Sequence, residues 1–358
     1  MNSEKLVTAV IITHNRVELL KKAVQSVLDQ TYPDIELIVV DDASIDETKE
    51  VFEKISKEKG FQYIYIPKEE SKGGNHARNV GIQAGNGEYV AFLDDDDEWL
   101  PEKIEKQVAL LNQYPECGVC HCGKIYDHNY GEKQRIQDTS KLLEGDLSKI
   151  IFYSFVCLSS TMMIRRNLLD EVGCFDEYLR FWQDYELCIR LFQKTKVAVV
   201  REPLVLFRVN PSDKNRLTNK IEGWELATDY IYKKYADEIE KLSDDELKKT
   251  SILYYRDGAM RCRNCGEFEQ QKQYLKKLYL TTHKLEDFIN MLMNIYSVRE
   301  LLREWKESIK NITTKIARGG VNNEEVLSEC LINLNNTYTR VYYFCRSEHY
   351  RNKAGCAA

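Results

Sequence analysis

The sequence predicts an α/β protein with a mixed, mostly parallel sheet between flanking helices, followed by a separate all-α region. Two observations carry this prediction. Short apolar runs rich in β-branched residues alternate with amphipathic helical patterns over residues 7–94. From about residue 216 the strand signal disappears, and segments with aromatic residues on an apolar helical face take its place. We therefore expect one domain at residues 1–215 and a helical C-terminal domain at residues 216–358.

The first half of the chain supplies the repeated strand and helix pattern. Each apolar run has the length of a buried strand, and each segment that follows has the period of an amphipathic helix. Strands connected through helices run parallel, so a doubly wound sheet is expected. Strands are expected at residues 7–13, 36–42, 61–67 and 88–94, and helices at residues 17–30, 46–60 and 75–85.

The second half completes the sheet and then becomes helical. Pro203 lies inside the apolar run 197–209 and removes a ladder hydrogen bond, so this run is expected to break into two strand pieces. The segment 317–326 is expected to link the helices to a short last helix. The helical domain is expected to serve packing or partner binding, such as an oligomer contact. Further strands are expected at residues 118–126 and 159–166, and helices at residues 184–195, 224–242, 244–264, 268–282 and 285–311.

Composition excludes several classes of protein. A net charge of −6 argues against a nucleic-acid binder, which normally presents a basic face. No apolar run reaches the roughly 18 to 20 residues of a membrane span, and the first residues lack the layout of a secretory signal. The expected location is therefore the cytoplasm, with peripheral association at the inner face of the membrane as an extension.

The eleven cysteines are interpreted as mostly reduced and buried, because they are spread through apolar stretches. Two clusters raise the alternative of a zinc site, which needs four ligands in a suitable loop. Both clusters fall within expected regular elements, so the zinc interpretation is the weaker one. The clusters are Cys117, Cys120, His121 and Cys122, and then Cys262 with Cys265.

Four consecutive aspartates, Asp94 to Asp97, follow the expected strand 88–94 directly. In extended geometry Asp94 and Asp96 face one side, and Asp95 and Asp97 face the other. Mg²⁺ and Mn²⁺ are usually held by one or two carboxylates together with substrate phosphates. The alternative is a surface turn in which Asp97 or Glu98 caps the next helix. Both interpretations remain open at this point, since a cap needs only one carboxylate.

Five motifs in order resemble the family 2 glycosyltransferases. The motifs read VIITHNR, LIVVDDASIDET, GGNHARNVGI, FLDDDDEW and FWQDYELCIRL, and the resemblance covers residues 6–212. Enzymes of this family have the Rossmann-like GT-A fold, and they invert the sugar that they transfer from a nucleotide diphosphate donor. The resemblance therefore implies a nucleotide-sugar donor, most simply a UDP-sugar, and a glycan or lipid-linked saccharide as acceptor.

The resemblance also implies roles for single residues. Asp42 corresponds to the residue that reads the base, and Asp96 to the ligand of the Mg²⁺ or Mn²⁺ ion that neutralises the leaving diphosphate. Asp94 corresponds to a residue near the ribose, whereas Asp95 and Asp97 are considered more dispensable. For Arg78, a phosphate partner and an ordinary charge on a helix surface both remain open. The implied donor-binding residues are Thr13, Asn15, Asp42, Gly74, Arg78, Asp94 and Asp95.

Asp184 corresponds to the general base, which takes the proton from the acceptor hydroxyl. The chain departs from the family here, because Gln183 stands where a glutamate is usual. It departs again at Asn210, where related chains often have a histidine that completes the metal shell. An amide oxygen is acceptable to Mg²⁺ or Mn²⁺, so Asn210 is assigned to the metal. The alternative for Asp184 is a carboxylate favoured by the dipole of a helix N-terminus.

Other function classes fit less well. No glycine-rich basic loop follows the first strand, as a nucleotidyltransferase would require, and no GxGxxG motif follows a strand, as a dehydrogenase would require. The QxxRW signature of processive synthases is absent after Asp184, which favours single additions. The remaining alternative is a catalytically silent sugar-nucleotide scaffold whose helical tail recruits partners.

Overall fold

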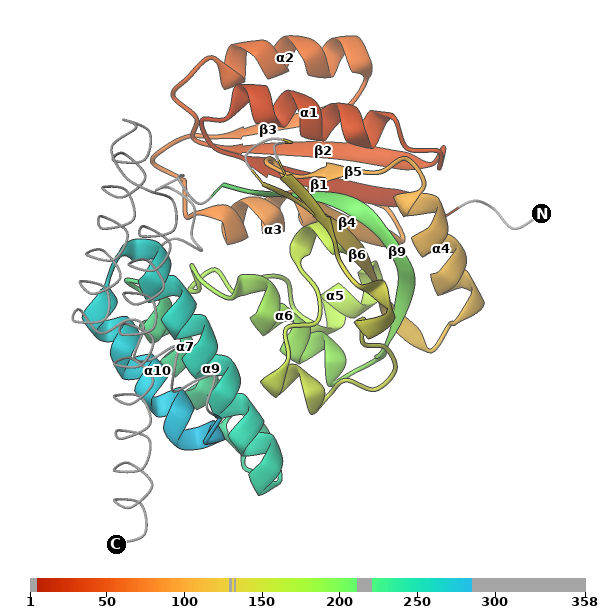
Figure 1. The fold of residues 1–358 in the computed structure, drawn as a ribbon. Coiled ribbons are helices and arrows are strands. Elements are labelled where there is room, and N and C mark those ends of the chain that lie inside the picture. Colours follow the sequence, from red (N-terminus) through yellow and green to blue (C-terminus); the bar gives the residue numbers. More distant parts are fainter. Residues whose placement is uncertain (1–4, 129–130, 132, 211–220, 285–358) are drawn as a thin grey trace, which may run out of the picture. The chain divides into compact units, whose positions relative to one another are not determined.

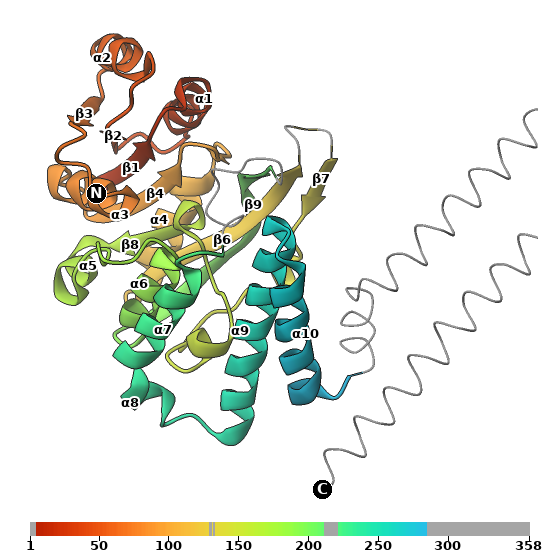
Figure 2. The ribbon, with the colours of Figure 1, turned by 90° about the vertical axis from the view of Figure 1, so that its left-hand side faces the viewer.

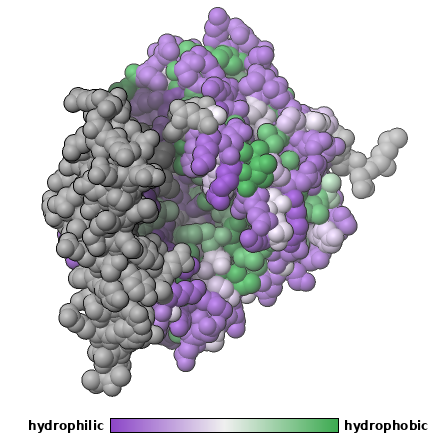
Figure 3. All heavy atoms as spheres, viewed as in Figure 1, coloured by the Kyte–Doolittle hydropathy of each residue, from purple (hydrophilic) through white to green (hydrophobic). Residues whose placement is uncertain are grey.

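A computed structural model describes residues 5–128, 131, 133–210 and 221–284. Contacts divide the chain into two compact units. The first comprises residues 1–217 and 222–243, and the second comprises residues 218–221 and 244–358. Most of the coloured surface in Figure 3, which belongs to described residues, is hydrophilic, with apolar side chains gathered in patches. Among the described residues, no helix is both long and apolar enough to cross a membrane.

The first unit is built on a mixed sheet, as the sequence predicts (Figure 1). Four parallel strands form one half, and β8 runs antiparallel to both of its neighbours, β4 and β6. In the described part of the chain the strand order is β3 (Gln62–Ile66), β2 (Ile35–Asp42), β1 (Val7–Thr13), β4 (Tyr89–Asp94), β8 (Met162–Arg165), β6 (Cys117–His128), β9 (Lys196–Val209) and β5 (Glu98–Trp99), and β7 (Lys133–Ile136) pairs with β6.

Helices cover both faces of the parallel half, because apolar side chains alternate along each strand. Ile11 belongs to the core that includes Leu20 of α1 (Val17–Leu28), whereas Ile38 and Val40 pack with Ala77 of α3 (Gly74–Ala84). Figure 1 shows α1 and α2 (Thr48–Lys59) on one side of these strands and α3 on the other. The predicted strands and helices of residues 7–94 are confirmed.

A glycine allows α3 to lie directly on the sheet. A Cβ atom at Gly81 would lie 2.4 Å from a methyl carbon of Val10 and 3.3 Å from one of Val40. Such a contact is far below van der Waals separation, so any larger residue would push the helix away from β1 and β2. This close packing fixes the first turn of α3 beside the carboxyl ends of the parallel strands.

The predicted break at Pro203 is wrong, because β9 continues through it as one strand. The register with β6 passes from Cys122↔Val200 to Gly123↔Pro203, which leaves a bulge at Arg201 and Glu202. A bulge is where a sheet tolerates proline. The strand can therefore extend along the whole of β6 as far as Val209.

Further helices surround the second half of this sheet. In the first unit they are α4 (Lys103–Gln113), α5 (Arg166–Val172), α6 (Gln183–Phe192), α7 (Trp224–Lys234) and α8 (Ala236–Ile239), with short 3₁₀ turns η1 (Thr139–Lys141), η2 (Ile150–Tyr153) and η3 (Ser159–Thr161).

Helices α7 and α8 belong to the first unit, although the sequence places them after the predicted boundary at residues 215 and 216. Trp224 of α7 is fully buried, and its ring centroid lies 5.6 Å from that of Trp182, just before α6. Tyr235 donates a 2.6 Å hydrogen bond to Glu186 of α6. The predicted domain boundary stays a prediction, but these contacts group residues 222–243 with the sheet.

The second unit contains α9 (Asp244–Cys265) and α10 (Phe268–Thr282), close to the predicted bounds. Figure 2 shows the two helices side by side. Gly258 of α9 permits this approach, because a Cβ there would lie 2.8 Å from the ring of Tyr274. The predicted helix 285–311, the linker 317–326 and the last helix lie outside the described residues.

Candidate active site

The polar ends of three parallel strands lie next to one another. Thr13 of β1 pairs in register with Asp41 of β2, and Ile12 pairs with Asp94 of β4. The residues that follow these positions are therefore brought to one edge of the sheet. Ligands of doubly wound sheets bind at this edge, outside the carboxyl ends of the strands.

The four aspartates form a turn, and the turn changes which of them meet. The backbone N–H of Asp97 donates to the carbonyl of Asp94 at 3.0 Å, so the chain reverses after the strand. Carboxylate oxygens of Asp94, Asp96 and Asp97 lie within 4.8 Å of one another. The expectation that Asp97 faces away from Asp94 and Asp96 is therefore wrong, because extended alternation stops at Asp94.

These three carboxylates fit a hard divalent cation. Asp94 and Asp96 are partly exposed, so a ligand can reach them, whereas Asp97 is buried. Asp97 accepts a 2.6 Å hydrogen bond from Ser160 Oγ and a 3.1 Å bond from the backbone of Arg208. Burial and the charges of Asp96 and Asp94 raise the pKa of Asp97 well above its usual range. A cation beside the three groups would offset this repulsion.

Asp95 does not belong to the group of three carboxylates, and it joins β1 to the turn. It accepts hydrogen bonds from Thr13 Oγ1 at 2.8 Å and from Arg16 Nη1 at 3.0 Å. Arg16 also lies 3.6 Å from Asp96. Thr13 is thus brought to the site through Asp95, and the donor-binding roles predicted for both residues stay predictions.

The stability of the metal-free protein is expected to depend on Asp95. Burial raises the pKa of Asp95 to about 7, whereas an unfolded aspartate has a pKa of about 3.9. Between these two pKa values Asp95 holds a proton in the folded chain but releases it in the unfolded chain. The contribution of Asp95 to the free energy of unfolding therefore decreases as the pH rises from about 4 to about 7. We expect the free energy of unfolding of Asp95→Asn, relative to that of wild type, to increase over this range and to stay constant above it.

Urea unfolding with EDTA between pH 4 and 8 measures this difference. Asp97 and Asp184 have raised pKa values as well, so they also make the free energy of unfolding depend on pH. The measured quantity is therefore the difference in this pH dependence between wild type and Asp95→Asn. The exposed Asp229→Asn serves as the control and should follow wild type. A constant difference between Asp95→Asn and wild type at every pH would contradict the prediction.

Arg78 is directed inward, although it lies on a helix. It is 9% exposed, donates to Asp94 Oδ1 at 2.6 Å, and lies 5.4 Å from the ring centroid of Phe175. The interpretation of Arg78 as a surface charge is therefore wrong. Gly74 opens the same helix, and a Cβ there would come within 3.1 Å of Ile12 and 3.4 Å of the Arg78 guanidinium. The N-terminal turn of α3 thus lies against the end of β1.

The aspartates after β2 have different partners. Both Asp41 oxygens are satisfied, by Tyr63 Oη at 2.5 Å and by the backbone of Ser44 at 2.9 Å. Asp42 has a buried oxygen, Oδ1, that receives no hydrogen bond within the described part of the chain. A buried carboxylate oxygen without a donor is costly, so this atom is suited to accept an N–H from a ligand.

Asn15 holds the loop beside Asp42 in place. Its backbone is left-handed, with φ of 55°, and its side-chain oxygen accepts from the N–H of Ile45 at 2.7 Å. His14 contributes a 2.6 Å hydrogen bond between its ring Nδ1 and the carbonyl of Asp42. Asn15 therefore joins the loops after β1 and β2, and its predicted contact with the donor stays a prediction.

Asp184 lies in the first turn of α6, and its electrostatic neighbours come from the strand ends. Burial and the negative charge of Asp94 raise the pKa of Asp184, while the charge of Arg78 acts in the opposite direction. Its Oδ1 accepts from the N–H of Tyr185 at 2.9 Å. The structure therefore brings the predicted base to the acidic turn, although about 90 residues separate the two in the sequence. A raised pKa is the property that a general base requires.

Two asparagines of α3 hold the loop that leads to Asp184, and sequence reasoning assigned them no role. Asn75 Nδ2 donates to the carbonyls of Asp176 and Leu179, at 2.7 and 2.8 Å. Asn79 exchanges two 2.9 Å hydrogen bonds with the backbone of Phe175. Their presence beside Arg78 in the NHARN segment was the available signal, since helix interiors disfavour asparagine unless its amide has a specific partner.

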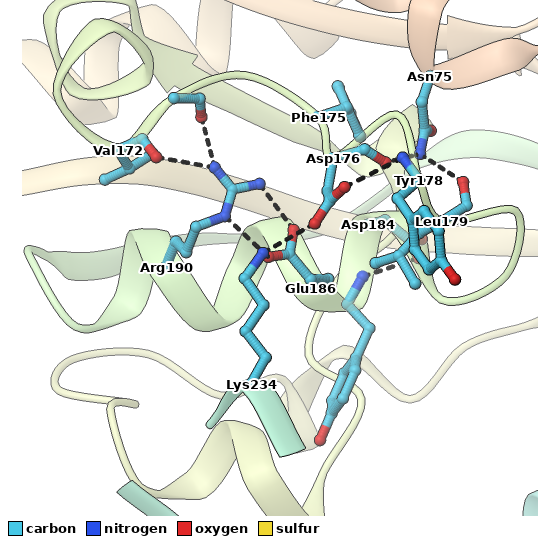
Figure 4. Close-up of polar contacts among 12 residues, drawn as sticks. Asn75, Val172, Phe175, Asp176, Tyr178, Leu179, Asp184, Glu186, Arg190 and Lys234 are labelled. Atoms are coloured by element: carbon cyan, nitrogen blue, oxygen red, sulfur yellow. Dashed lines mark hydrogen bonds and ion pairs between the residues drawn. The ribbon is translucent and has the colours of Figure 1, made fainter. Parts of the chain in front are cut away.

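A buried ionic network fixes α6 (Figure 4). Glu186, two residues after Asp184, is fully buried and pairs with Arg190 at 2.7 Å and with Lys234 of α7 at 2.8 Å. Lys234 also contacts Asp176 at 2.8 Å. Sequence reasoning missed this network because its members lie up to 58 residues apart. A fully buried carboxylate requires such partners, which makes the position of α6 specific.

Asn210 follows β9 directly and is partly buried. It lies two residues after Arg208, whose backbone N–H donates to Asp97. The chain thus carries Asn210 past the acidic turn, and its assignment to the metal stays a prediction.

The cysteines considered as zinc ligands have other surroundings. Cys120 and Cys122 are buried in β6, and His121 Nε2 forms a 2.8 Å hydrogen bond with the carbonyl of Leu143.

Comparisons with known proteins identify the family of the chain. Residues 8–173 match the family model of glycosyl transferase family 2. An uncharacterized glycosyltransferase of Rickettsia prowazekii is 30% identical over 322 residues, which are 87% of this chain and 95% of the relative. A β-1,3-glucosyltransferase of Campylobacter jejuni, named for GalNAc(5)-diNAcBac-PP-undecaprenol, is 26% identical and covers 70% of this chain and 81% of its own length.

A solved structure agrees with the fold. The mannosyltransferase PcManGT of Pyrobaculum calidifontis, in complex with GDP-Man and Mn²⁺, superimposes with a TM-score of 0.52 and 14% identity. The match covers 96% of this chain and 88% of that one, and it shows the predicted GT-A type of fold. From the family model, the Rickettsia relative and the arrangement of the strand ends, the chain belongs to glycosyl transferase family 2 and is a glycosyltransferase.

Proposed function

We propose that this enzyme transfers a hexose from a UDP-sugar to a hydroxyl group of a surface glycan, with inversion and with Asp184 as the general base. One observation carries the proposal. A partly buried carboxylate with a raised pKa lies within the electrostatic influence of an acidic turn at the end of β4. A base and a metal-binding turn at one sheet edge are the two components that transfer from a nucleotide diphosphate needs.

The residues divide the reaction between them. Asp184 accepts the proton of the acceptor hydroxyl, whose oxygen then forms a bond to the anomeric carbon. The bond from that carbon to the diphosphate breaks on the opposite side, and its electron pair leaves with the diphosphate. Asp94, Asp96 and Asp97 would hold a Mg²⁺ or Mn²⁺ ion, with Asn210 as a further oxygen ligand. The ion supplies positive charge for the leaving diphosphate.

Asp42 is the residue proposed to select the base. The N3–H of uracil is a donor, and Asp42 Oδ1 is a buried acceptor without a donor among the described residues. Arg78, already paired with Asp94, would contact the diphosphate, and the first turn of α3 at Gly74 would let the backbone approach it. The Campylobacter relative supports a lipid-linked saccharide as acceptor.

A screen of nucleotide sugars tests this function. UDP- and GDP-sugars are compared by thermal shift and by release of nucleotide diphosphate, each with Mn²⁺ and with EDTA. A ligand at a hundred times its dissociation constant stabilises the protein by about 2.7 kcal/mol. We expect stabilisation by UDP-sugars in Mn²⁺ and its loss in EDTA. If no donor released nucleotide diphosphate, with or without metal, the catalytically silent scaffold would be favoured.

The Asp42→Ala variant tests base selection in the same screen. Removing the partner of a ligand N–H in a partly buried site costs about 1 to 3 kcal/mol, so UDP affinity is expected to fall by about 5- to 150-fold. Glu47→Ala is the control, because Glu47 is exposed in the same loop and its side chain caps nothing. Unchanged UDP affinity in Asp42→Ala would contradict the assignment.

A further inference from the structure

One face of the β6–β9 strand pair carries cations and aromatic rings together. Tyr126 of β6 pairs in register with Phe207 of β9 and with Arg135 of β7, so the three side chains lie in a row on one face. The rings of Tyr126 and Phe207 meet edge to face at 6.1 Å. Lys124 lies on the same face, with Nζ 5.2 Å from the Tyr126 ring and 4.8 Å from the Phe207 ring. We call these four residues the acceptor face.

The acceptor face is reachable and positively charged. Arg135 is exposed, and the other three side chains are partly exposed. Within the described part of the chain, neither Lys124 nor Arg135 has a carboxylate partner, and the Arg135 guanidinium lies 4.4 Å from the Tyr126 ring. On the opposite face the arrangement differs, because Arg208 forms ion pairs with Asp127 and Glu98.

Lys124 connects the acceptor face to the reacting centre. Burial lowers the pKa of Lys124 to about 8, and the nearby charges of Asp97 and Asp184 act against this decrease. Both the acidic turn and the proposed base are therefore close enough to influence its ammonium group. The backbone N–H of Arg208, the neighbour of Phe207, donates to Asp97 at 3.1 Å, so this part of β9 lies beside the acidic turn. None of the predicted donor-binding residues lies on β6 or β7.

The chemistry of the acceptor face selects a class of ligand. Aromatic rings bind the apolar faces of sugars, and a half-buried ammonium group that forms no ion pair within the described part of the chain is stabilised when an anion of a ligand pairs with it. We propose that the acceptor face binds an acidic acceptor glycan, with Lys124 pairing with a carboxylate or phosphate beside the reacting hydroxyl. This inference rests on the proposed function, because it names the acceptor class of that same site.

The test compares two probes that differ in one carboxylate. Methyl β-glucuronide and methyl β-glucoside are titrated into the full-length protein with UDP and Mn²⁺, and binding is followed by NMR. A hydrogen bond to a charged group contributes about 1.5 to 3 kcal/mol, so the wild-type protein is expected to prefer the glucuronide by about tenfold or more. Lys124→Met is expected to remove this preference, and Lys124→Arg is expected to retain part of it.

Two further variants distinguish the cations of the acceptor face from a lysine elsewhere on the sheet. Lys196→Met changes an exposed lysine at the far end of β9 and should keep the preference. Arg135→Gln changes an exposed residue of the acceptor face and should reduce the preference for the glucuronide. This variant tests the proposal even if Lys124→Met does not fold. UDP affinity should stay unchanged in each variant.

Three results would overturn the inference. Equal binding of the two probes by wild type would show that the face does not select an anion. A preference that survives Lys124→Met would remove the lysine from the subsite. Weaker UDP binding in Lys124→Met, with the probe preference intact, would assign the lysine to the donor diphosphate. Failure of the wild type to bind UDP would instead count against the proposed function itself.

Discussion

Asp184→Asn is expected to lower the rate of UDP release from the UDP-sugar by about 10²- to 10⁴-fold, the usual contribution of a general base. The amide has the size of the carboxylate but cannot accept the proton of the acceptor hydroxyl. UDP affinity in Mn²⁺ is expected to stay within a few-fold of wild type, because the proposed base acts on the acceptor hydroxyl. Steady-state kinetics and a UDP titration measure the two quantities.

The pH profile gives an independent reading of the same residue. A base must be deprotonated to act, and the pKa of Asp184 is raised by burial and by Asp94. The acidic limb of the rate profile is therefore expected above the ordinary range of an aspartate. Gln183→Ala is the control, since the side chain of Gln183 donates only to the carbonyl of Arg180 within the described chain. A wild-type rate in Asp184→Asn would remove Asp184 as the base.

Asp96→Ala is expected to abolish the response to metal, with a loss of activity of at least about a hundredfold. A divalent ion needs oxygen ligands, and of the three clustered carboxylates Asp96 is partly exposed, whereas Asp97 is already hydrogen-bonded to Ser160 and to Arg208. Isothermal titration of Mn²⁺ in the presence of UDP should show binding to wild type and none to the variant.

The control for this experiment is Asp229→Ala, which removes an exposed carboxylate of α7. It should bind Mn²⁺ as wild type does. Thermal unfolding without metal tells a lost ligand from a damaged fold, because Asp96→Ala should unfold near the wild-type temperature. Mn²⁺-dependent activity in Asp96→Ala equal to that of wild type would rule out this residue as the ligand.

The sequence predicts the parallel half of the sheet well, because burial on both faces leaves nearly continuous apolar runs. It also predicts which strand ends approach one another, since parallel strands bring their carboxyl ends to one edge. Local geometry is harder to predict. The period-2 argument for Asp97 fails because a hydrogen bond from its own backbone to Asp94 turns the chain. The break expected at Pro203 fails because a bulge absorbs the proline.

Contacts between distant segments could not be predicted from one sequence. The partners of Glu186 come from the same helix and from α7, and nothing in the local pattern of either element specifies the other. Lys124 is inconspicuous for the same reason, because its neighbours Tyr126 and Phe207 meet it only through strand pairing. Contacts between side chains that lie far apart in the sequence can be identified only from the three-dimensional structure.

The link between Glu186 and Lys234 has a consequence for the smallest fragment that works as an enzyme. A chain shortened to residue 215 would retain all five sequence motifs, including the acidic turn and Asp184. It would lose Lys234 and Tyr235, and so two of the groups that compensate a fully buried carboxylate two residues after the proposed base. We therefore expect catalysis to require the chain to continue beyond the recognisable motifs, through α7 and α8.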